Sequence, residues 1–263
     1  KELKELLGGK GANLAEMANI NIPIPPGFTI TTIACKHYNK QQKKLSNEMI
    51  AEIKENIKKL EETTKKTFGD PNNPLLLSVR SGAAVSMPGM MDTILNLGLN
   101  DEVVIGLSKQ SNNEQFAWDS YRRFIQMFGD VVMGIPHHHF EKILENIKEK
   151  TNVTYDTELS VNALKEIVEE YKELIQKQTN NSFPQDVNEQ LKQSIQAVFN
   201  SWNNTRAIKY REINEINGLE GTAVNVQTMV FGNMGEDSAT GVCFTRNPST
   251  GENAFYGEYL INA

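Results

Sequence analysis

The chain has 263 residues, of which 39% are hydrophobic and 23% are charged, an ordinary balance for a folded protein with a buried core. Its net charge of −6 argues against a nucleic-acid-binding surface, which selects Lys- and Arg-rich faces. No run approaches the roughly 18 to 20 apolar residues of a membrane span, and no segment has the apolar core of a secretory signal. The two cysteines, Cys35 and Cys243, require no disulfide framework, so we expect a reducing compartment such as the cytoplasm.

The first hundred residues mix helix and strand patterns. Residues 1–20 are predicted to form a glycine loop that leads into a helix. Three prolines and a glycine within 21–32 predict a turn into a strand. Apolar residues at helical spacing predict a helix over 45–60, and the apolar run 75–79 predicts a buried strand.

The middle of the chain has a different pattern. Apolar side chains recur at helical spacing within 121–128 and within 164–174, and a third helix is predicted further on. We therefore interpret residues 101–200 as an all-helical insertion. It separates two portions of mixed structure, 1–100 and 201–263.

The last part of the chain returns to strand patterns. A strand is predicted within 222–231, where Val224, Val226 and Val230 alternate with other side chains such as Asn225 and Gln227. Residues 233–241 form a turn-rich loop, and further strands are predicted over 242–245 and 254–262. We interpret the first strand, the loop and the second strand as a ribbon with glycines at its tip, which is what a backbone clamp over a phosphate chain requires. The chain stops within the apolar run 256–263, which predicts that it is part of a longer polypeptide.

Two segments place a cation beside a flexible backbone. Lys10 lies in 8-GGKGAN-13, where glycines permit close approach to an anion and a helix N-terminus presents free N–H groups. Arg80 ends a buried run and precedes a Gly/Ser loop, a position that suits the binding of phosphate oxygens. The alternatives are a solvated lysine and a structural ion pair. Arg122 and Arg123, on a predicted helix, could equally be solvated or paired.

Two further groups of residues have simple alternatives. The Met-Pro-Gly-Met-Met segment at 87–91 either fills gaps in a core or covers a flat ligand as an adaptable lid. The three histidines at 137–139 point about 100° apart on a helix, so they cannot easily converge on one ion. No metal site is expected there.

A set of motifs spreads over nearly the whole chain: 7-LGGKGANLAEM, 25-PPGFTITT, 78-SVRSGAAVSMPGMMDTILNLGLND, 116-FAWDSYRRFIQMFGDVVMG, 201-SW, 206-RAIKYR, 222-TAVNVQTMVFGNMGEDSATGVCFTRNPSTGE and 257-GEYLINA. Together these motifs resemble the pyruvate phosphate dikinase family, and the Ser-Met-Pro-Gly-Met-Met-Asp-Thr segment is particularly specific to it. This resemblance implies an α+β fold, namely an ATP-grasp nucleotide-binding domain that is interrupted by an all-helical subdomain and incomplete at its C-terminus.

The resemblance also implies a phosphotransferase reaction, in which ATP, phosphate and pyruvate give AMP, pyrophosphate and phosphoenolpyruvate. This domain would serve the ATP and phosphate half-reaction, which phosphorylates a histidine on a separate swivelling domain. A barrel domain would then pass the phosphoryl group to pyruvate. The whole protein is expected to be a homodimer in the cytoplasm, a plastid or a peroxisome-like organelle. The alternatives are a phosphoenolpyruvate synthase-type domain, with water as the second acceptor, and a non-catalytic nucleotide-binding or docking module.

The resemblance assigns site residues position by position. Lys10 and Arg80 match cations that bind the triphosphate, and Arg123 matches a further arginine of the phosphate site; these three would be catalytic. Gly89 and Met91 match loop positions whose backbone approaches the nucleotide, and Gln227 matches a strand residue beside the adenine pocket. Thr240 and Gly241 match the phosphate-clamping tip, and Glu258 matches an acidic site residue.

Two departures from the family pattern bear on the site. Ala239 stands where the family usually has a glycine, and its β-carbon would restrict the backbone if φ were positive. The family continues past Ala263 with an Asp-x-Glu pair that holds the metal, followed by a Gln-x-Arg. We therefore expect Mg²⁺ to come with ATP and most of its protein ligands to lie beyond residue 263. On this reading residues 1–263 alone bind Mg-ATP weakly at best and do not turn over.

Overall fold

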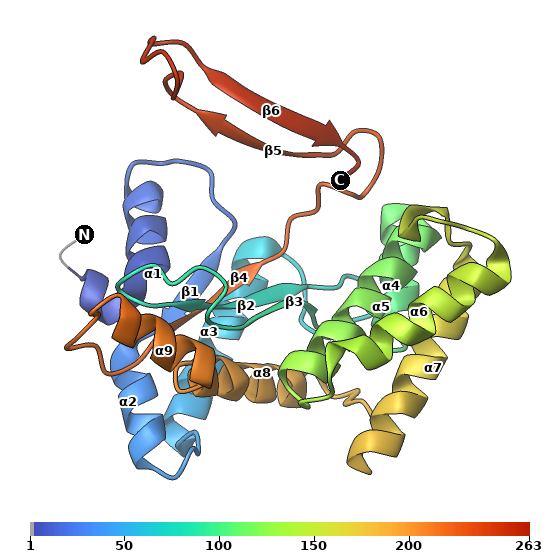
Figure 1. Cartoon of the computed structure of the whole chain (residues 1–263), viewed down its shortest axis with the longest axis horizontal. Coiled ribbons are helices and arrows are strands. Elements are labelled where there is room, and N and C mark those ends of the chain that lie inside the picture. The colour runs from blue at the N-terminus through green and yellow to red at the C-terminus, as the bar shows by residue number, and fades with distance from the viewer. Residues whose placement is uncertain (1–2) are drawn as a thin grey trace.

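A computed structural model describes residues 3–263, in which helices surround a four-stranded sheet (Figure 1). Residues 1–2, part of the first predicted element, lie outside the described residues. The α+β class is confirmed. The elements are α1 (Lys4–Asn19), β1 (Gly27–Ile30), α2 (Thr32–Lys40), α3 (Asn47–Thr64), β2 (Leu77–Gly82), β3 (Thr93–Leu97), α4 (Val103–Ser111), α5 (Glu114–Val131), α6 (His137–Thr151), the 3-10 turn η1 (Asp156–Glu158), α7 (Val161–Thr179), α8 (Val187–Ser201), α9 (Thr205–Ile213), β4 (Ala223–Thr228), β5 (Ala239–Phe244) and β6 (Tyr256–Ile261).

The four-stranded sheet has the order β1-β4-β2-β3, and all its strand pairs are antiparallel. Asn225 on β4 lies opposite Thr29 on β1 and Arg80 on β2, and Arg80 lies opposite Thr93 on β3. Side chains of directly opposed residues project to the same face of a sheet. Thr29, Asn225, Arg80 and Thr93 therefore form a polar row across one face, and we call these four residues the polar row.

The other face of the sheet is apolar and packs on α8, which lies beneath the sheet in Figure 1. Val79, Ile94 and Val226 alternate with the polar row along their strands and are fully buried. Facing them, α8 buries Ile195 and Val198. Although α8 lies within the predicted helical block 101–200, it packs against β2, β3 and β4, so the division of the chain at residue 200 stays a proposal.

The other helices of the middle block form a bundle beside the sheet. Helix α5 packs on α4, α7 and β3, and α6 packs on α7. The predicted apolar stripe of α5 is confirmed, since Tyr121, Phe124 and Phe128 are fully buried. Phe183 meets the rings of Phe124 and Phe128 edge-on, with centroids 5.6 and 5.5 Å apart. Within residues 3–263, no helix combines the length and the apolar character that crossing a bilayer requires.

One asparagine pair fixes the junction between α4 and α5. Asn112 adopts the left-handed conformation, φ 50°, and ends α4. Asn113 caps α5, because its side-chain oxygen accepts a hydrogen bond from the Phe116 backbone N–H at 3.0 Å. The Asn113 amide also donates to the Met234 carbonyl at 3.0 Å. The junction thereby anchors the segment that follows β4.

The predicted ribbon is wrong in its pairing. Strand β4 has β1 on one edge and β2 on the other, so it has no free edge for β5. Instead β5 pairs with β6 in a separate two-stranded ribbon, which lies on the far side of the sheet from α8 (Figure 1). The glycine-containing segment 233–238 therefore connects two sheets and is not a hairpin tip. At the ribbon's base, the Asn262 N–H donates to Ser238 and the Ala263 N–H donates to Gly232, at 2.7 and 3.0 Å.

Candidate functional site

The predicted glycine-lysine loop is a sharp break in α1. Gly8 has φ 70° and ψ 170°, which divides α1 into two helical segments, and the second one contains Lys10. The break lets the loop pack against the end of β2, where the Gly9 N–H donates to the Ala83 carbonyl at 2.8 Å. A β-carbon at Gly8 would lie 1.6 Å from the Gly82 carbonyl oxygen, so only glycine fits. Lys10 is thus held beside the strand that carries Arg80.

Lys10 and Arg80 are two neighbouring cations for which residues 3–263 supply no counter-charge. The Lys10 ammonium donates to the Ser81 carbonyl at 2.8 Å, and among residues 3–263 neither cation has a carboxylate within 4.0 Å. Burial lowers the pKa of Lys10, and the positive charge of Arg80 lowers it further. Burial also lowers the pKa of Arg80. Within the described residues, the structural ion pair considered for Arg80 is therefore wrong.

Gln227 holds the Arg80 guanidinium. The side-chain oxygen of Gln227 accepts a hydrogen bond from Arg80 Nη2, and its amide donates to the Pro25 carbonyl at 2.9 Å. Gln227 is only 5% exposed. Because Gln227 is neutral, it orients the Arg80 guanidinium without compensating its positive charge. The proposed role of Gln227 beside an adenine pocket stays a prediction.

The loop 83–91, which we call the methionine loop, covers a cavity beside Lys10. This cavity of about 510 Å³ is lined by the glycine-lysine loop, the end of β2 and the loop 83–91. Lys10, Gly89 and Met91 therefore share one cavity. Gly89 has φ 71° and open space around it, so its backbone is accessible. Met87, by contrast, is 6% exposed and packs on Trp202, which confirms the gap-filling role for this methionine.

The methionine loop is anchored by α9 and the end of α8. Arg206 forms an ion pair with Asp92, and its Nε donates to the Met90 carbonyl at 3.2 Å. Ser201 Oγ accepts a hydrogen bond from the Asp92 N–H at 3.3 Å. Burial raises the pKa of the Asp92 carboxyl, and the charge of Arg206 opposes this shift. The sequence pattern alone revealed none of these anchors.

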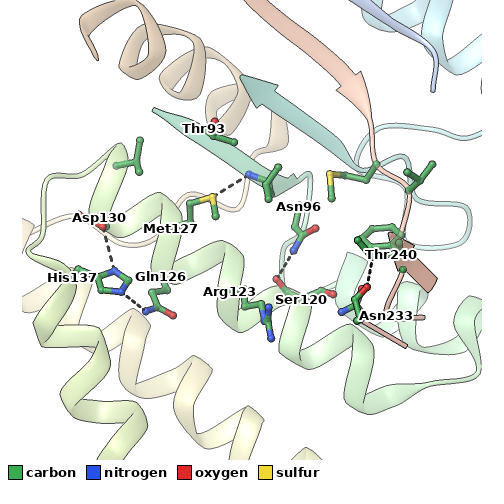
Figure 2. Close-up of a pocket in the computed structure, with 17 residues that line it drawn as sticks. Thr93, Asn96, Ser120, Arg123, Gln126, Met127, Asp130, His137, Asn233 and Thr240 are labelled. Atoms are coloured by element: carbon green, nitrogen blue, oxygen red, sulfur yellow. Dashed lines mark hydrogen bonds and ion pairs between the residues drawn. The ribbon is translucent and has the colours of Figure 1, made fainter. Parts of the chain in front are cut away.

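A second cavity of about 630 Å³ lies between α5, β3 and the segment after β4 (Figure 2). Arg123 from α5 and Thr240 from β5 both line it, and Thr93 lines this cavity as well as the first. Arg123 pairs with Asp119 at 2.7 Å, and its side chain remains 52% exposed. The neighbouring Arg122 is buried between Asp119 and Asp156, so of the two arginines only Arg123 offers a solvent-accessible charge to the second cavity.

Gly241 and Glu258 lie on the exposed β5–β6 ribbon and line neither of these two cavities. Glu258 is paired with Val242 across the ribbon, and Gly241 with Tyr259. The expected strain at Ala239 does not arise, because Ala239 lies in a regular strand and has no positive φ.

Magnesium ligands require a group of hard oxygen donors. In the described part of the chain, no three His, Cys, Asp or Glu side chains are grouped so that they could hold a metal ion. At the second cavity, the two ring nitrogens of His137 contact one carboxylate each. Nδ1 lies 3.3 Å from Asp130 Oδ2, and Nε2 lies 3.3 Å from Glu141 Oε1. This finding concerns protein side chains alone, and Mg²⁺ in nucleotide sites is usually held by one or two carboxylates together with the substrate's phosphates.

Comparisons with known proteins identify the family of the chain. A family profile described as "Pyruvate phosphate dikinase, AMP/ATP-binding domain" matches residues 4–50 and 41–263. The chloroplastic pyruvate, phosphate dikinase of Mesembryanthemum crystallinum is 60% identical over 263 residues, which is 100% of this chain and 28% of that protein. The chloroplastic pyruvate, phosphate dikinase 1 of Arabidopsis thaliana is 59% identical over the same length, 27% of that protein.

A bacterial relative matches equally well. The pyruvate, phosphate dikinase of Clostridium symbiosum is 58% identical over 262 residues, which is 99% of this chain and 30% of that protein. The chain thus spans about three tenths of the length of these curated relatives. With the family profile covering nearly all of its residues, the chain belongs to the pyruvate phosphate dikinase family, in the AMP/ATP-binding domain.

Proposed function

We propose that this chain binds the triphosphate of ATP and serves the ATP and phosphate half of the pyruvate, phosphate dikinase reaction. The observation that carries the proposal is the pair Lys10 and Arg80, an exposed lysine and a half-buried arginine that are both held by neutral partners. Burying a charge without a counter-charge is costly, so such a pair is characteristic of a site that binds an anion.

The proposed mechanism is positioning and charge neutralisation. Phosphoryl transfer from ATP spreads negative charge over the phosphate oxygens, and fixed cations stabilise that charge. Lys10 lines the first cavity and would bind the triphosphate there. Arg80 precedes the cavity-lining Ser81 on β2 and would bind the same triphosphate, although it does not itself line the cavity. Thr93 lines both cavities, so a nucleotide that passes it reaches Arg123 and Thr240 in the second one. Gly89 and Met91 would cover the phosphates through their backbone.

Other parts of the proposal concern the whole protein. The additional length of the relatives is proposed to include the swivelling domain with the phosphorylated histidine and the barrel that binds pyruvate. We propose that Mg²⁺ enters with ATP and that the assembled protein is a homodimer. Its compartment is proposed to be the cytoplasm or a plastid. Gly241 and Glu258 are proposed to join the site only when the ribbon approaches the sheet.

An assay of the natural protein that contains this chain tests the function. Formation of AMP from ATP that requires both inorganic phosphate and pyruvate, with pyrophosphate as a product, is the expected result. AMP formation that proceeds with pyruvate and no phosphate would instead assign a phosphoenolpyruvate synthase-type reaction. Nucleotide binding with neither product would assign a non-catalytic module.

The lowered pKa of Lys10 predicts a proton linkage. A bound phosphate group supplies the missing counter-charge and raises the Lys10 pKa again, so binding takes up protons at alkaline pH. Affinity for ATP should therefore fall as the pH rises through the Lys10 pKa of the free protein. Calorimetry in buffers of different ionisation enthalpy measures the uptake. Lys10→Met should abolish it, and an unchanged uptake in that variant would contradict the assignment.

A further inference from the structure

Asn225 lies near the centre of the polar row, and its amide is a donor with no partner in the described part of the chain. It is 1% exposed and lies on β4 between Thr29 and Arg80. Its side-chain oxygen accepts a hydrogen bond from the Thr29 hydroxyl at 2.9 Å, which fixes the orientation of the amide. The amide nitrogen is buried and has no hydrogen-bond partner within residues 3–263. A buried donor without a partner is unfavourable, and each such group calls for an explanation.

Arg80 presents a second donor of the same kind. Its Nε is also buried without a partner among the described residues, although its Nη2 donates to Gln227. Arg80 and Asn225 are direct neighbours on adjacent strands, so their side chains leave the same face side by side. Two unpaired N–H donors next to each other match the geometry of a site that binds one oxyanion oxygen.

The position of Asn225 also relates to the first cavity. A β-carbon built on Gly82 would lie 2.6 Å from the Asn225 amide nitrogen and 3.6 Å from Lys10 Cβ. Gly82 lines the first cavity together with Lys10. The Asn225 amide therefore lies close to the backbone of Gly82, which lines the cavity that holds Lys10, although Asn225 does not itself line it.

The chemical identity of Asn225 matters for the charge of the site. An aspartate has nearly the same shape, but its carboxylate would be within reach of Arg80 and would cancel part of the positive charge. We propose that Asn225 is a further anion-binding residue of this site. Its amide binds a phosphoryl oxygen together with Arg80 Nε. Because the amide is neutral, it leaves Lys10 and Arg80 without an internal counter-charge. This inference rests on the proposed function of the same site.

The test compares Asn225→Asp with the unaltered residue in the natural protein that contains this chain. Calorimetry with Mg-ATP and with inorganic pyrophosphate should show affinity lowered by roughly 100-fold for both. The midpoint of thermal unfolding should stay unchanged or rise, because the new carboxylate pairs with Arg80. A residue that only supports the fold would lose stability and affinity together. Asn56→Asp, which adds the same charge at a half-buried position of α3, is the matched control and should bind as the wild type does.

A second variant covers the case in which Asn225→Asp does not fold. Thr29→Val removes the hydroxyl that orients the Asn225 amide and should weaken pyrophosphate binding by up to about tenfold. Unchanged affinity in both Asn225→Asp and Thr29→Val would overturn the inference, as would an affinity loss that only follows lost stability. If Lys10→Ala and Arg80→Ala also leave binding unchanged, the proposed function fails as well. If they weaken binding while the Asn225 and Thr29 variants do not, only the inference fails.

Discussion

Replacing Arg80 with alanine in the natural protein that contains this chain is expected to lower kcat/KM for ATP by roughly 100- to 1,000-fold. Arg80 has no carboxylate partner within residues 3–263, so its removal leaves no buried counter-charge behind, and the loss should appear in catalysis more than in stability. Lys10→Ala should produce a loss of similar size. The measurement is the rate of AMP formation at varied ATP concentration.

The half-reactions separate a specific role from a general one. In the proposed reaction, phosphoryl exchange between phosphoenolpyruvate and the histidine of the swivelling domain does not use the triphosphate, so it should continue in both variants. Arg246→Ala is the matched control, because Arg246 is an exposed arginine on the turn between β5 and β6. Equal loss of both half-reactions in Arg80→Ala, or an equal effect of Arg246→Ala, would contradict the assigned role.

Gly8→Ala is expected to destabilise the fold by at least about 3 kcal/mol. Two costs combine at this position. The backbone has φ 70° and ψ 170°, which a residue with a β-carbon avoids, and that β-carbon would meet the Gly82 carbonyl at 1.6 Å. The loop must therefore move away from β2, which also displaces Lys10 from Ser81. Urea unfolding followed by circular dichroism measures the loss of stability.

Gly134→Ala separates the two costs. Gly134 has φ 73°, close to that of Gly8, but a β-carbon there would have open space. This variant should cost only about 1 kcal/mol, the cost of the positive φ alone. If both variants were equally destabilised, the close approach between the glycine-lysine loop and β2 would not be what makes Gly8 necessary.

The sequence predicted the helices well because their signals are local. The apolar spacing over 45–60 became α3, and the buried stripe of α5 contains the aromatic residues that its periodicity indicated. The strand predicted over 75–79 begins two residues too early and ends three residues too early, because β2 extends from Leu77 to Gly82. Its end was missed because Ser81 and Gly82 are poor strand formers that nevertheless pair with Val224 and Ala223 of β4.

The errors and omissions concern contacts between distant residues. Whether 233–241 is a hairpin tip depends on which edge of β4 is free, and β1 and β2 occupy both edges. The partner of Arg80 is equally non-local, since Gln227 follows it by 147 positions. One local signal was available: Asn225 and Gln227 interrupt a run of valines at alternate positions, which indicates that β4 has a polar face.

The order of the strands has a consequence for how the chain becomes functional. Strand β4 begins at Ala223, yet it lies between β1 and β2 and carries Gln227, which holds Arg80. Contacts between such distant segments form slowly and only once the later segment has been synthesised. During translation, Lys10 and Arg80 therefore leave the ribosome well before the strand that completes their surroundings. The ability to bind an anion should appear abruptly, when β4 inserts between its two neighbours, and not gradually as the helices form.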